Sequence, residues 1–371
     1  MKEPAYCVII AGGKGTRFWP LSRSQRPKQL LKILSSRSLI RETADRVLPI
    51  SGPNQTLIVT VAEQLEGLAQ ELRMLPRANF LAEPEGKNTA PCIGLAALEV
   101  VARNPEGIML VLPADHWVAD ADAFRRTLSA ALKLARMSDH LITIGIRPDY
   151  PETGYGYIMK GQSLDRTETI SAYHVKRFKE KPSEGAARRL IRQGSLWNSG
   201  IFAWRASVLL TLMRRYQTAI AKGLEKISQA AREKSLARPN PRLKRLVADE
   251  YKKMPNISID HAVLERAGSE GKVLTLEANF AWSDVGSWAA VHRMMERDAD
   301  GNAGNGSWLA LGAKNCLIHS KDRLVVLLGI QDAVVVDAPD ALLVADLKRS
   351  QEVRELVEEL KKKGYGAYTV K

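Results

Sequence analysis

The chain has 371 residues, of which 45% are hydrophobic and 26% are charged, so it can bury one large core with a smaller unit beside it. This composition excludes a disordered or fibrous protein. The 55 Lys and Arg residues outnumber the 41 Asp and Glu residues and give a formal net charge of +14, which suits a nucleic acid, an acidic membrane surface or a polyanionic small substrate.

The N-terminal stretch MKEPAYCVIIAGG has only a short apolar run before its glycines, so it predicts a buried strand and not a signal peptide. Cys7, Cys92 and Cys316 are far apart and odd in number, which predicts reduced core thiols of a cytoplasmic protein. Aspartates interrupt the most apolar later region, residues 323–347, which therefore cannot cross a bilayer. We expect no membrane association.

The first 146 residues alternate between short β-branched runs and amphipathic stretches. This rhythm predicts an α/β protein with a Rossmann-like mixed, mainly parallel sheet flanked by helices. Ligands of such sheets bind beyond the carboxyl ends of the strands, where Gly12, Gly13, Glu83 and Asp115 fall. The expected strands are residues 6–11, 56–61, 79–84, 107–115 and 141–146, and the expected helices are residues 38–50, 63–72, 90–103 and 122–136.

Residues 154–204 have a more antiparallel texture, with a helical stretch at 183–194, and predict an inserted sheet layer that closes over the first half. Residues 213–253 hold twelve Lys and Arg against four Asp and Glu with few aromatics between them, which we interpret as a solvated helical arm. After Asp298, a Gly/Asn/Asp loop cluster precedes several short strands and a charged closing helix. We expect one domain over residues 1–299 and a small C-terminal β-rich, solenoid-like domain over residues 300–371.

The stretch AGGKGTRFWPLSRSQRPKQLL, residues 11–31, follows the first strand and fits neither common phosphate-binding motif. A Walker loop would need Lys and Ser or Thr after Gly15, and a dinucleotide fingerprint would need glycine at Phe18. A glycine-rich turn still lets backbone N–H groups approach an anion. Arg17 adds a planar guanidinium group and Lys28 a compact ammonium charge, a combination suited to a triphosphate. The competing interpretation is a tight turn before a solvated basic helix.

This stretch resembles the signature of the sugar-1-phosphate nucleotidyltransferases. The resemblance, to members of that family that form GDP-mannose, continues through EPEGKNTAPCIGLAAL, LPADHW, TGYGYI, FKEKP, WNSGIFAW, SIDHAVLE and WSDVGSW, and into the tail at NCLIHS, VVVDAPDALLVAD and VRELVEELK. It covers nearly the whole chain. It implies a nucleotide-diphospho-sugar transferase (GT-A-like) catalytic domain followed by a short left-handed β-helix-like domain.

The resemblance implies the reaction of GTP with α-D-mannose 1-phosphate to give GDP-mannose and pyrophosphate. An oxygen of the sugar phosphate would attack the α-phosphorus in line, with Mg²⁺ or another divalent cation, so no enzyme nucleophile is needed. A triphosphate site of this kind needs hard oxygen ligands for the cation. The resemblance assigns them to Asp115 and Asp284; helix capping and a turn are the structural alternatives for these two residues.

Further roles follow from the resemblance, residue by residue. Arg17 would stabilise the pyrophosphate and Lys28 the reacting phosphates, and together with Asp115 and Asp284 they are the expected catalytic residues. Lys181 would meet the phosphate of the sugar. The expected nucleotide-binding residues are Ala11, Gly12, Gly13, Gly15, Thr16, Arg17, Glu83, Glu85, Asn88, Thr89 and Asp115, and the expected sugar-phosphate-binding residues are Gly154, Tyr155, Glu180, Lys181, Asn198, Gly200 and Asp260.

Some of these residues have structural alternatives. The carboxylate of Glu85 can accept from guanine N1–H and N2–H₂, whereas Asn88 or Thr89 can cap the helix that follows. Asn198 alone would fit a buried strand end. The six histidines lack paired ligand spacing, and His116 beside a metal candidate is expected to support the site and not to be catalytic.

Alternative functions remain open at this point. The sugar could be glucose or a heptose, or the chain could be a non-catalytic GDP-sugar-binding regulatory protein. A nucleic-acid binder is compatible with the charge, but no recognition motif for one is present, so we expect no nucleic-acid partner. The resemblance suggests that the C-terminal strands support a homodimer. Longer relatives carry a phosphomannose isomerase cupin domain that this sequence lacks, so we expect no isomerase activity, and Trp117 is bulkier than the family pattern suggests.

Overall fold

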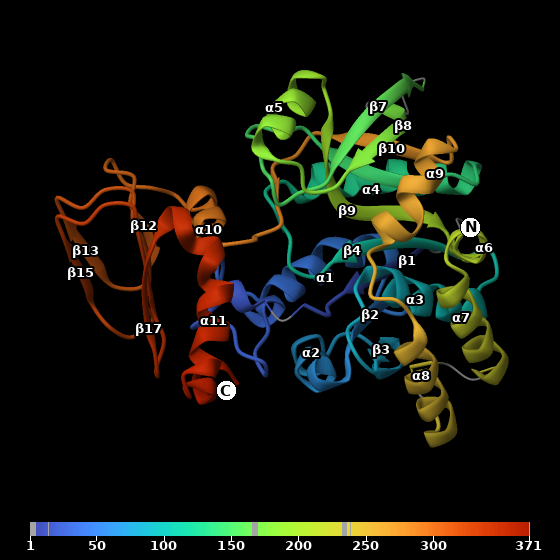
Figure 1. Cartoon of the computed structure of the whole chain (residues 1–371), viewed down its shortest axis with the longest axis horizontal. Coiled ribbons are helices and arrows are strands. Elements are labelled where there is room, and N and C mark those ends of the chain that lie inside the picture. Colours follow the sequence, from blue (N-terminus) through green and yellow to red (C-terminus); the bar gives the residue numbers. More distant parts are fainter. Residues whose placement is uncertain (1–4, 14, 165–169, 232–235, 238, 371) are drawn as a thin grey trace.

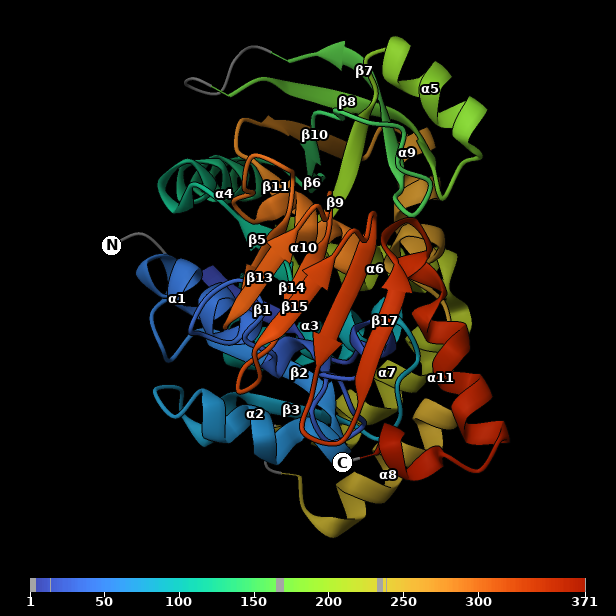
Figure 2. The same ribbon diagram turned by 90° about the vertical axis from the view of Figure 1, so that its left-hand side faces the viewer.

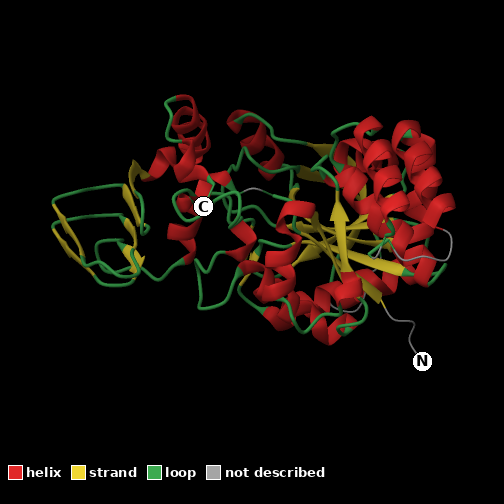
Figure 3. Cartoon of the chain, turned by 90° about the horizontal axis from the view of Figure 1, so that it is seen from below, coloured by secondary structure: helices red, strands yellow, loops and turns green. Residues whose placement is uncertain are grey.

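The computed structural model describes residues 5–13, 15–164, 170–231, 236–237 and 239–370. Figure 1 shows an α/β body and, beside it, a smaller β unit, with the helix α11 (Val353–Lys362) lying between the two. The body holds a central sheet with helices on both faces (Figure 3). The expected fold class is therefore confirmed.

In the part of the chain that the structure describes, nine strands form the main sheet in the order β3-β2-β1-β4-β9-β6-β10-β8-β7. Pairings within the described residues show that β8 and β9 run against the other seven, so the sheet is mixed and mainly parallel. The strands are β1 (Ala5–Ile10), β2 (Thr56–Val61), β3 (Phe80–Glu83), β4 (Ile108–Pro113), β6 (Leu141–Ile146), β7 (Tyr157–Ser163), β8 (Ala172–Lys179), β9 (Leu196–Arg205) and β10 (Val273–Ala278).

Each face of this sheet has its own core because successive strand residues point to opposite sides. In β1, Tyr6 and Val8 belong to one buried cluster, while Cys7 and Ile9 belong to the other. The four helices expected in the first half are confirmed as α1 (Leu39–Ser51), α2 (Leu65–Glu71), α3 (Thr89–Arg103) and α4 (Ala121–Met137). The later helices of the body are α5 (Glu184–Arg192), α6 (Ala206–Tyr216), α7 (Thr218–Ala231), α8 (Pro241–Lys253), α9 (Glu265–Ser269) and α10 (Trp288–Met294).

The antiparallel texture predicted for residues 154–204 is confirmed, but the expected inserted layer over the first half is wrong. Strand β9 inserts between β4 and β6 in the middle of the main sheet, and β7 and β8 extend the same sheet at its far edge. The reason lies in β9 itself: Phe202 and Trp204 pack into one core and Ile201 and Ala203 into the other, so the strand must be covered on both faces.

Where the structure describes it, the basic segment 213–253 is mainly helical, as predicted: it supplies the last turn of α6 and all of α7 and α8, while residues 232–235 and 238 lie outside the described residues. Arg214, Lys222 and Lys244 are exposed, whereas Leu224 and Tyr251 on the inner faces of α7 and α8 are buried in the core. The segment is thus amphipathic, with its charge on the solvent side.

The C-terminal β unit stacks parallel strands on one another, as in a solenoid. Ala303 pairs with Leu317, and Leu317 pairs with Val334, in successive parallel rungs. Figure 2 views these strands from the side of the small unit. The strands are β12 (Ala303–Asn305), β13 (Trp308–Leu311), β14 (Leu317–His319), β15 (Val325–Leu328), β16 (Ala333–Asp337) and β17 (Leu342–Asp346).

As predicted, Cys7, Cys92 and Cys316 are unpaired and buried. In the part of the chain that the structure describes, no helix is long and apolar enough to cross a bilayer.

Candidate active site

A cavity of about 570 Å³ opens beyond the carboxyl ends of β1 and β4. It brings together six of the residues singled out from the sequence, from segments far apart along the chain: Gly15, Thr16, Arg17, Lys28, Asp115 and Asp284. We call this space the phosphate cavity. Its other lining residues are Phe18, His116, Gly286, Arg354, Glu358 and Lys361.

Hydrogen bonds from neighbouring elements hold the start of the glycine-rich turn in place. Ala11 donates its N–H to the Val59 carbonyl, and its own carbonyl accepts from Gln29 Nε2 and Thr60 Oγ1, each at 2.8 Å. Ala11 therefore supports the turn with both backbone groups already bonded. Buried Gln29 was not singled out from the sequence, because an isolated glutamine gives no signal of its contacts.

Lys28 is the central cation of the cavity. Its side chain is almost completely buried, and Nζ lies 2.8 Å from Oδ2 of Asp115 and donates to the backbone carbonyl of Asp284 at 2.6 Å. The ammonium also lies over the Phe18 ring, 5.6 Å from its centroid. One side chain thus ties the first loop to both predicted metal-ligand segments.

Asp115 and Asp284 come together because their flanking residues form a short antiparallel ladder. In this ladder β5 (Trp117–Val118) pairs with β11 (Trp282–Ser283), with Trp117 opposite Ser283. Asp115 does not cap the following helix, because Asp120 is the N-cap of α4. Trp117 is thus a ladder residue, half-buried beside the site.

The side chain of Asp115 is 30% exposed, and its surroundings favour the charged form. Its burial works against ionisation, but the Lys28 ammonium and His116 outweigh this and lower the pKa of Asp115. A Cβ on Gly286 would lie 2.9 Å from Asp284 Oδ2, so any larger residue at this position would displace the Asp284 carboxylate. The carboxylate of Asp284 accepts from Tyr155 at Oδ1, 2.7 Å away.

Hard carboxylate oxygens at Asp115 and Asp284 suit Mg²⁺. Among the described residues, no group of three or more His, Cys, Asp or Glu side chains forms a metal-binding set. The two carboxylates therefore fit a cation that takes its remaining ligands from phosphate oxygens and water.

His116 packs beside the two carboxylates without being a candidate acid or base. Trp282 Nε1 donates to His116 Nδ1 at 3.2 Å, and the two rings meet edge to face with centroids 5.1 Å apart. Burial is the largest cause that lowers the pKa of His116 to about 4, although Asp115 and Asp284 act in the opposite direction. His116 is therefore neutral near pH 7 and supports the site, as predicted.

A second group of polar side chains lies next to the phosphate cavity and contains the predicted sugar residues. Asn198 Nδ2 donates to Asp260 Oδ1 at 2.7 Å, and Asn198 Oδ1 accepts from Thr143 at 3.1 Å. Burial first, and then the nearby charge of Glu180, raise the pKa of Asp260 to about 6. Asn198 is thus not a simple buried strand end, because its amide positions an unusually basic carboxylate.

The remaining residues of the predicted sugar site border this group. Lys181 forms an ion pair with Glu180 at 2.6 Å, and its N–H donates to the Tyr155 carbonyl. Gly200 has φ of +69°, and a Cβ there would meet Pro113 and His116 within 4 Å. Gly154 lies exposed at the rim.

The predicted base-recognition stretch lies on the opposite side of the glycine-rich turn. Glu83 is only 2% exposed, accepts from the Tyr251 hydroxyl at 3.1 Å, and points toward Gly12, where a Cβ would lie 3.6 Å from Oε2. Burial raises the pKa of Glu83 to about 7, although hydrogen bonds from Cys92 and Tyr251 act to lower it. Glu83 therefore titrates near neutrality.

Two of the base-side residues have structural roles as well. Asn88 is the N-cap of α3, with Oδ1 accepting from the Thr89 N–H, so the capping alternative holds for it. Thr89 Oγ1 accepts from the Ile259 N–H at 2.8 Å, which joins this loop to the segment that carries Asp260. Glu85 is half-exposed and lies 3.4 Å from Lys87.

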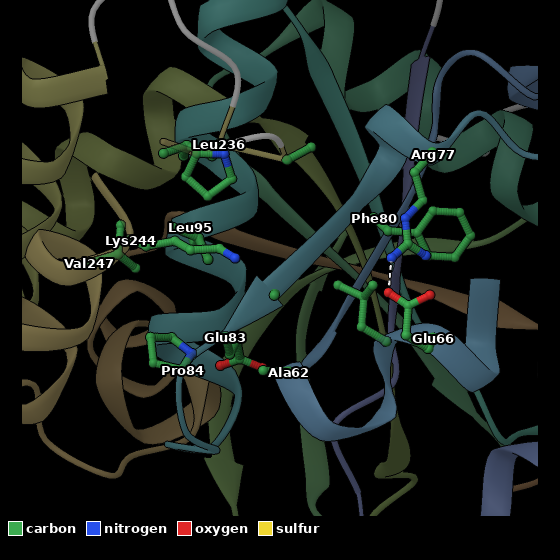
Figure 4. A pocket seen from close by; sticks show the side chains of 14 residues that line it. Ala62, Glu66, Arg77, Phe80, Glu83, Pro84, Leu95, Leu236, Lys244 and Val247 are labelled. Atoms are coloured by element: carbon green, nitrogen blue, oxygen red, sulfur yellow. Dashed lines mark hydrogen bonds and ion pairs between the residues drawn. The ribbon is translucent and has the colours of Figure 1, made fainter. Parts of the chain in front are cut away.

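A second cavity, of about 510 Å³, lies along the edge strand β3 between α2 and α8. Figure 4 shows Phe80, Leu95 and Pro84 around it, with Glu83 at one end and the Arg77 and Glu66 pair at another. Of the predicted site residues only Glu83 lines it. Cations and carboxylates converge instead in the phosphate cavity.

Two family models match the chain. The Nucleotidyl transferase model matches residues 6–301. A second model, described as a MannoseP isomerase/GMP-like beta-helix domain, matches residues 306–360.

Individual relatives are similar over nearly the whole chain. The mannose-1-phosphate guanylyltransferase of Escherichia coli K12 is 36% identical over 366 residues, covering 97% of this chain and 74% of that protein. The xanthan biosynthesis protein XanB of Xanthomonas campestris strain B100 is 37% identical over 364 residues, covering 96% and 73%. A solved structure from Thermus thermophilus, described as a mannose-1-phosphate geranyltransferase, matches with a TM-score of 0.84 at 32% identity and covers 96% and 99%.

Proposed function

Because this chain belongs to the nucleotidyl transferase family, we propose that it transfers the guanylyl group of GTP to α-D-mannose 1-phosphate, forming GDP-mannose and pyrophosphate. One observation supports this most: Arg17, Lys28, Asp115 and Asp284 converge on one cavity at the carboxyl ends of β1 and β4. The similarity to a mannose-1-phosphate guanylyltransferase over 97% of the chain supports the choice of substrates. In this proposal residues 1–299 are the catalytic domain.

The reaction needs positioning and charge stabilisation and no covalent intermediate. An oxygen of the sugar phosphate attacks the α-phosphorus of GTP in line, and pyrophosphate leaves from the opposite side. Lys28 holds the reacting phosphates, and Arg17 stabilises the charge that develops on the leaving pyrophosphate. The glycine-rich turn offers the backbone N–H groups of Gly12, Gly13, Gly15 and Thr16 to the phosphates.

Asp115 and Asp284 would hold a divalent cation, which when bound neutralises charge on the triphosphate. The neighbouring Lys28 ammonium lowers the pKa of Asp115, so this carboxylate is in the ionised form that a cation ligand needs. Tyr155 donates to Asp284 and orients it from the sugar side. The same hydroxyl therefore couples the position of the sugar loop to that of the metal carboxylate.

Substrate selection follows from the two flanking groups of polar side chains. We assign guanine recognition to Glu83 through Thr89, where Glu85 can accept from N1–H and N2–H₂. We assign the sugar hydroxyls to Glu180, Asn198 and Asp260, since a site built to bond hydroxyls rejects an epimer by leaving buried groups unpaired. Lys181 reaches the phosphate of the sugar.

The apolar surface of the small β unit supports the expected homodimer. Leu309 and Leu311 on β13 and Val326 and Leu328 on β15 are exposed on adjacent strands. Four neighbouring aliphatic side chains on one sheet form a surface that a second copy would cover. We also propose a cytoplasmic location, which the three free buried cysteines support.

The test is pyrophosphate release by the purified protein with Mg²⁺. Each common nucleoside triphosphate is combined with mannose 1-phosphate and with glucose 1-phosphate. We expect release with GTP and mannose 1-phosphate at a kcat/KM at least about tenfold above that of any other pair. Release with a different pair would overturn the base or sugar assignment, and binding of GDP-mannose without any turnover would favour a regulatory protein.

A further inference from the structure

The C-terminal helix α11 forms one wall of the phosphate cavity. Arg354, Glu358 and Lys361 line that cavity together with Arg17 and Lys28. Their spacing of four and three residues places them on one face of the helix. Val353 and Val357, on a neighbouring face, are 3% exposed and pack in the same core cluster as Phe18 and Trp19.

The chain after α11 is bound to the loop that carries Arg17 and Lys28. Trp19 Nε1 donates to the Tyr368 carbonyl at 2.8 Å, and the N–H groups of Ser24 and Gln25 donate to the carbonyls of Thr369 and Val370. Before α11, Arg23 forms a 2.8 Å ion pair with Asp340. Contacts of the chain after α11 and of the β16–β17 turn therefore join the small C-terminal unit to the loop that carries Arg17 and Lys28, and α11 packs on that loop through Val353 and Val357.

A nucleoside triphosphate in the phosphate cavity needs positive charge beyond that of Lys28, and the basic side chains of α11 can supply it. Lys28 is already 2.8 Å from Asp115, so it does not by itself balance the phosphates of a nucleoside triphosphate. Lys361 lies 2.9 Å from Glu358, and these side chains are 47% and 55% exposed. Such an exposed ion pair contributes little free energy, so the ammonium can exchange it for a phosphate oxygen at little cost.

We propose that Arg354 and Lys361 bind the β- and γ-phosphates of the nucleotide and the pyrophosphate product, and that Glu358 holds Lys361 in their absence. This proposal rests on the proposed function and adds to it that the small C-terminal unit supplies part of the nucleotide site. The two products should differ in how they depend on these residues, because GDP-mannose does not contain the pyrophosphate group that leaves. Arg354 and Lys361 should therefore matter for GTP and pyrophosphate and not for GDP-mannose.

The experiment measures binding of inorganic pyrophosphate with Mg²⁺ and of GDP-mannose by titration calorimetry. It compares the wild type with the double variant Arg354→Ala/Lys361→Ala. The matched control is Arg349→Ala/Lys362→Ala, which removes two basic residues that pair with Glu352 and Glu359 nearby and that do not line the cavity. Thermal unfolding verifies that each variant is folded.

We expect the double variant to weaken pyrophosphate binding at least about tenfold and to change GDP-mannose binding less than about twofold, while the control stays within about twofold for both. Glu358→Gln should have the opposite sign and tighten pyrophosphate binding. Wild-type pyrophosphate affinity in the double variant, or equal weakening of both ligands, would overturn the proposal. Absence of turnover with GTP and mannose 1-phosphate would instead count against the proposed function, because pyrophosphate binding is measured without turnover.

Discussion

A side chain at Gly15 would overlap Lys28. Gly15 has φ of +63°, and a Cβ built there would overlap Lys28 Cβ and lie 2.8 Å from the Lys28 backbone nitrogen. The glycine-rich turn and the central lysine are thus packed backbone against backbone, 13 residues apart in the chain. This close approach sets where the Lys28 ammonium meets Asp115.

Gly15→Ala should therefore displace Lys28. We expect kcat/KM for pyrophosphate release to fall at least about tenfold, and the free energy of unfolding to fall by about 1–3 kcal/mol from backbone strain. Gly271→Ala is the control, since Gly271 has φ of +72° but open space at its Cβ. If both variants lose the same stability and both keep full activity, the packing of Gly15 on Lys28 is unimportant for catalysis.

Asp115→Asn and Asp284→Asn should each abolish turnover in a folded protein. An amide is a weaker ligand for Mg²⁺ than a carboxylate, so we expect kcat to fall at least about 100-fold, and chelation of the metal should do the same to the wild type. Asp120→Asn is the control, because asparagine also caps a helix well at that position. Near-normal activity in either site variant would remove that residue from the proposed metal site.

Sugar-phosphate binding should depend on the ionisation of Asp260. The pKa of this carboxyl is raised to about 6, so the carboxylate becomes protonated as the pH falls from 7 to 5, and the neutral acid accepts a hydrogen bond from a sugar hydroxyl more weakly than the anion does. We expect the KM for mannose 1-phosphate to rise over that range, and Asp260→Asn to have a raised KM at pH 7.5.

The phosphate of the substrate also titrates near pH 6. The informative quantity is therefore the ratio of the KM of the variant to that of the wild type at each pH. We expect this ratio to fall toward one as the pH falls. A ratio that is constant with pH would contradict a role for the Asp260 carboxylate.

The buried carboxyl of Glu83 should make the protein less stable at high pH. Its pKa of about 7 lies above the ordinary glutamate value of 4.5, so the native state retains a proton that the unfolded state loses. Its contribution to stability is therefore complete below about pH 4.5 and is lost as the pH rises through about 7, by about 3 kcal/mol in total.

Glu83→Gln should remove this dependence, because the neutral amide keeps its hydrogen-bonding oxygen for Tyr251. Urea unfolding from pH 5 to pH 8 measures it: we expect the variant to gain stability relative to the wild type as the pH rises. Exposed Glu66 supplies the control Glu66→Gln, for which no such gain is expected. If the free energies of unfolding of the wild type and of Glu83→Gln differ by the same amount at every pH from 5 to 8, the prediction is refuted.

The apolar face of the small β unit should mediate self-association. Leu311 and Leu328 pair across β13 and β15 and are 66% and 71% exposed. Replacing both with Asp places charges in the proposed interface, and light scattering should then report a mass near 41.0 kDa where the wild type gives twice that value. A wild type that is already monomeric would overturn the homodimer proposal.

The local pattern of the sequence determined much of the fold and the chemical character of the site. The alternation of apolar strands with amphipathic helices up to Ile146 is confirmed element by element, because burial of one or both faces leaves its period in the chain. The same pattern placed Asp115 just after β4, at the edge of the sheet where ligands bind.

Only the tertiary structure decided which distant segments meet. The apolar run of β9 was compatible with a separate layer or a central strand, and packing on both faces selected the central position. The β5–β11 ladder that joins Asp115 to Asp284, and the placement of α11 over the phosphate cavity, depend on contacts between residues more than 160 positions apart. A local sequence pattern records which side of an element is buried, but it does not record the partner that buries it.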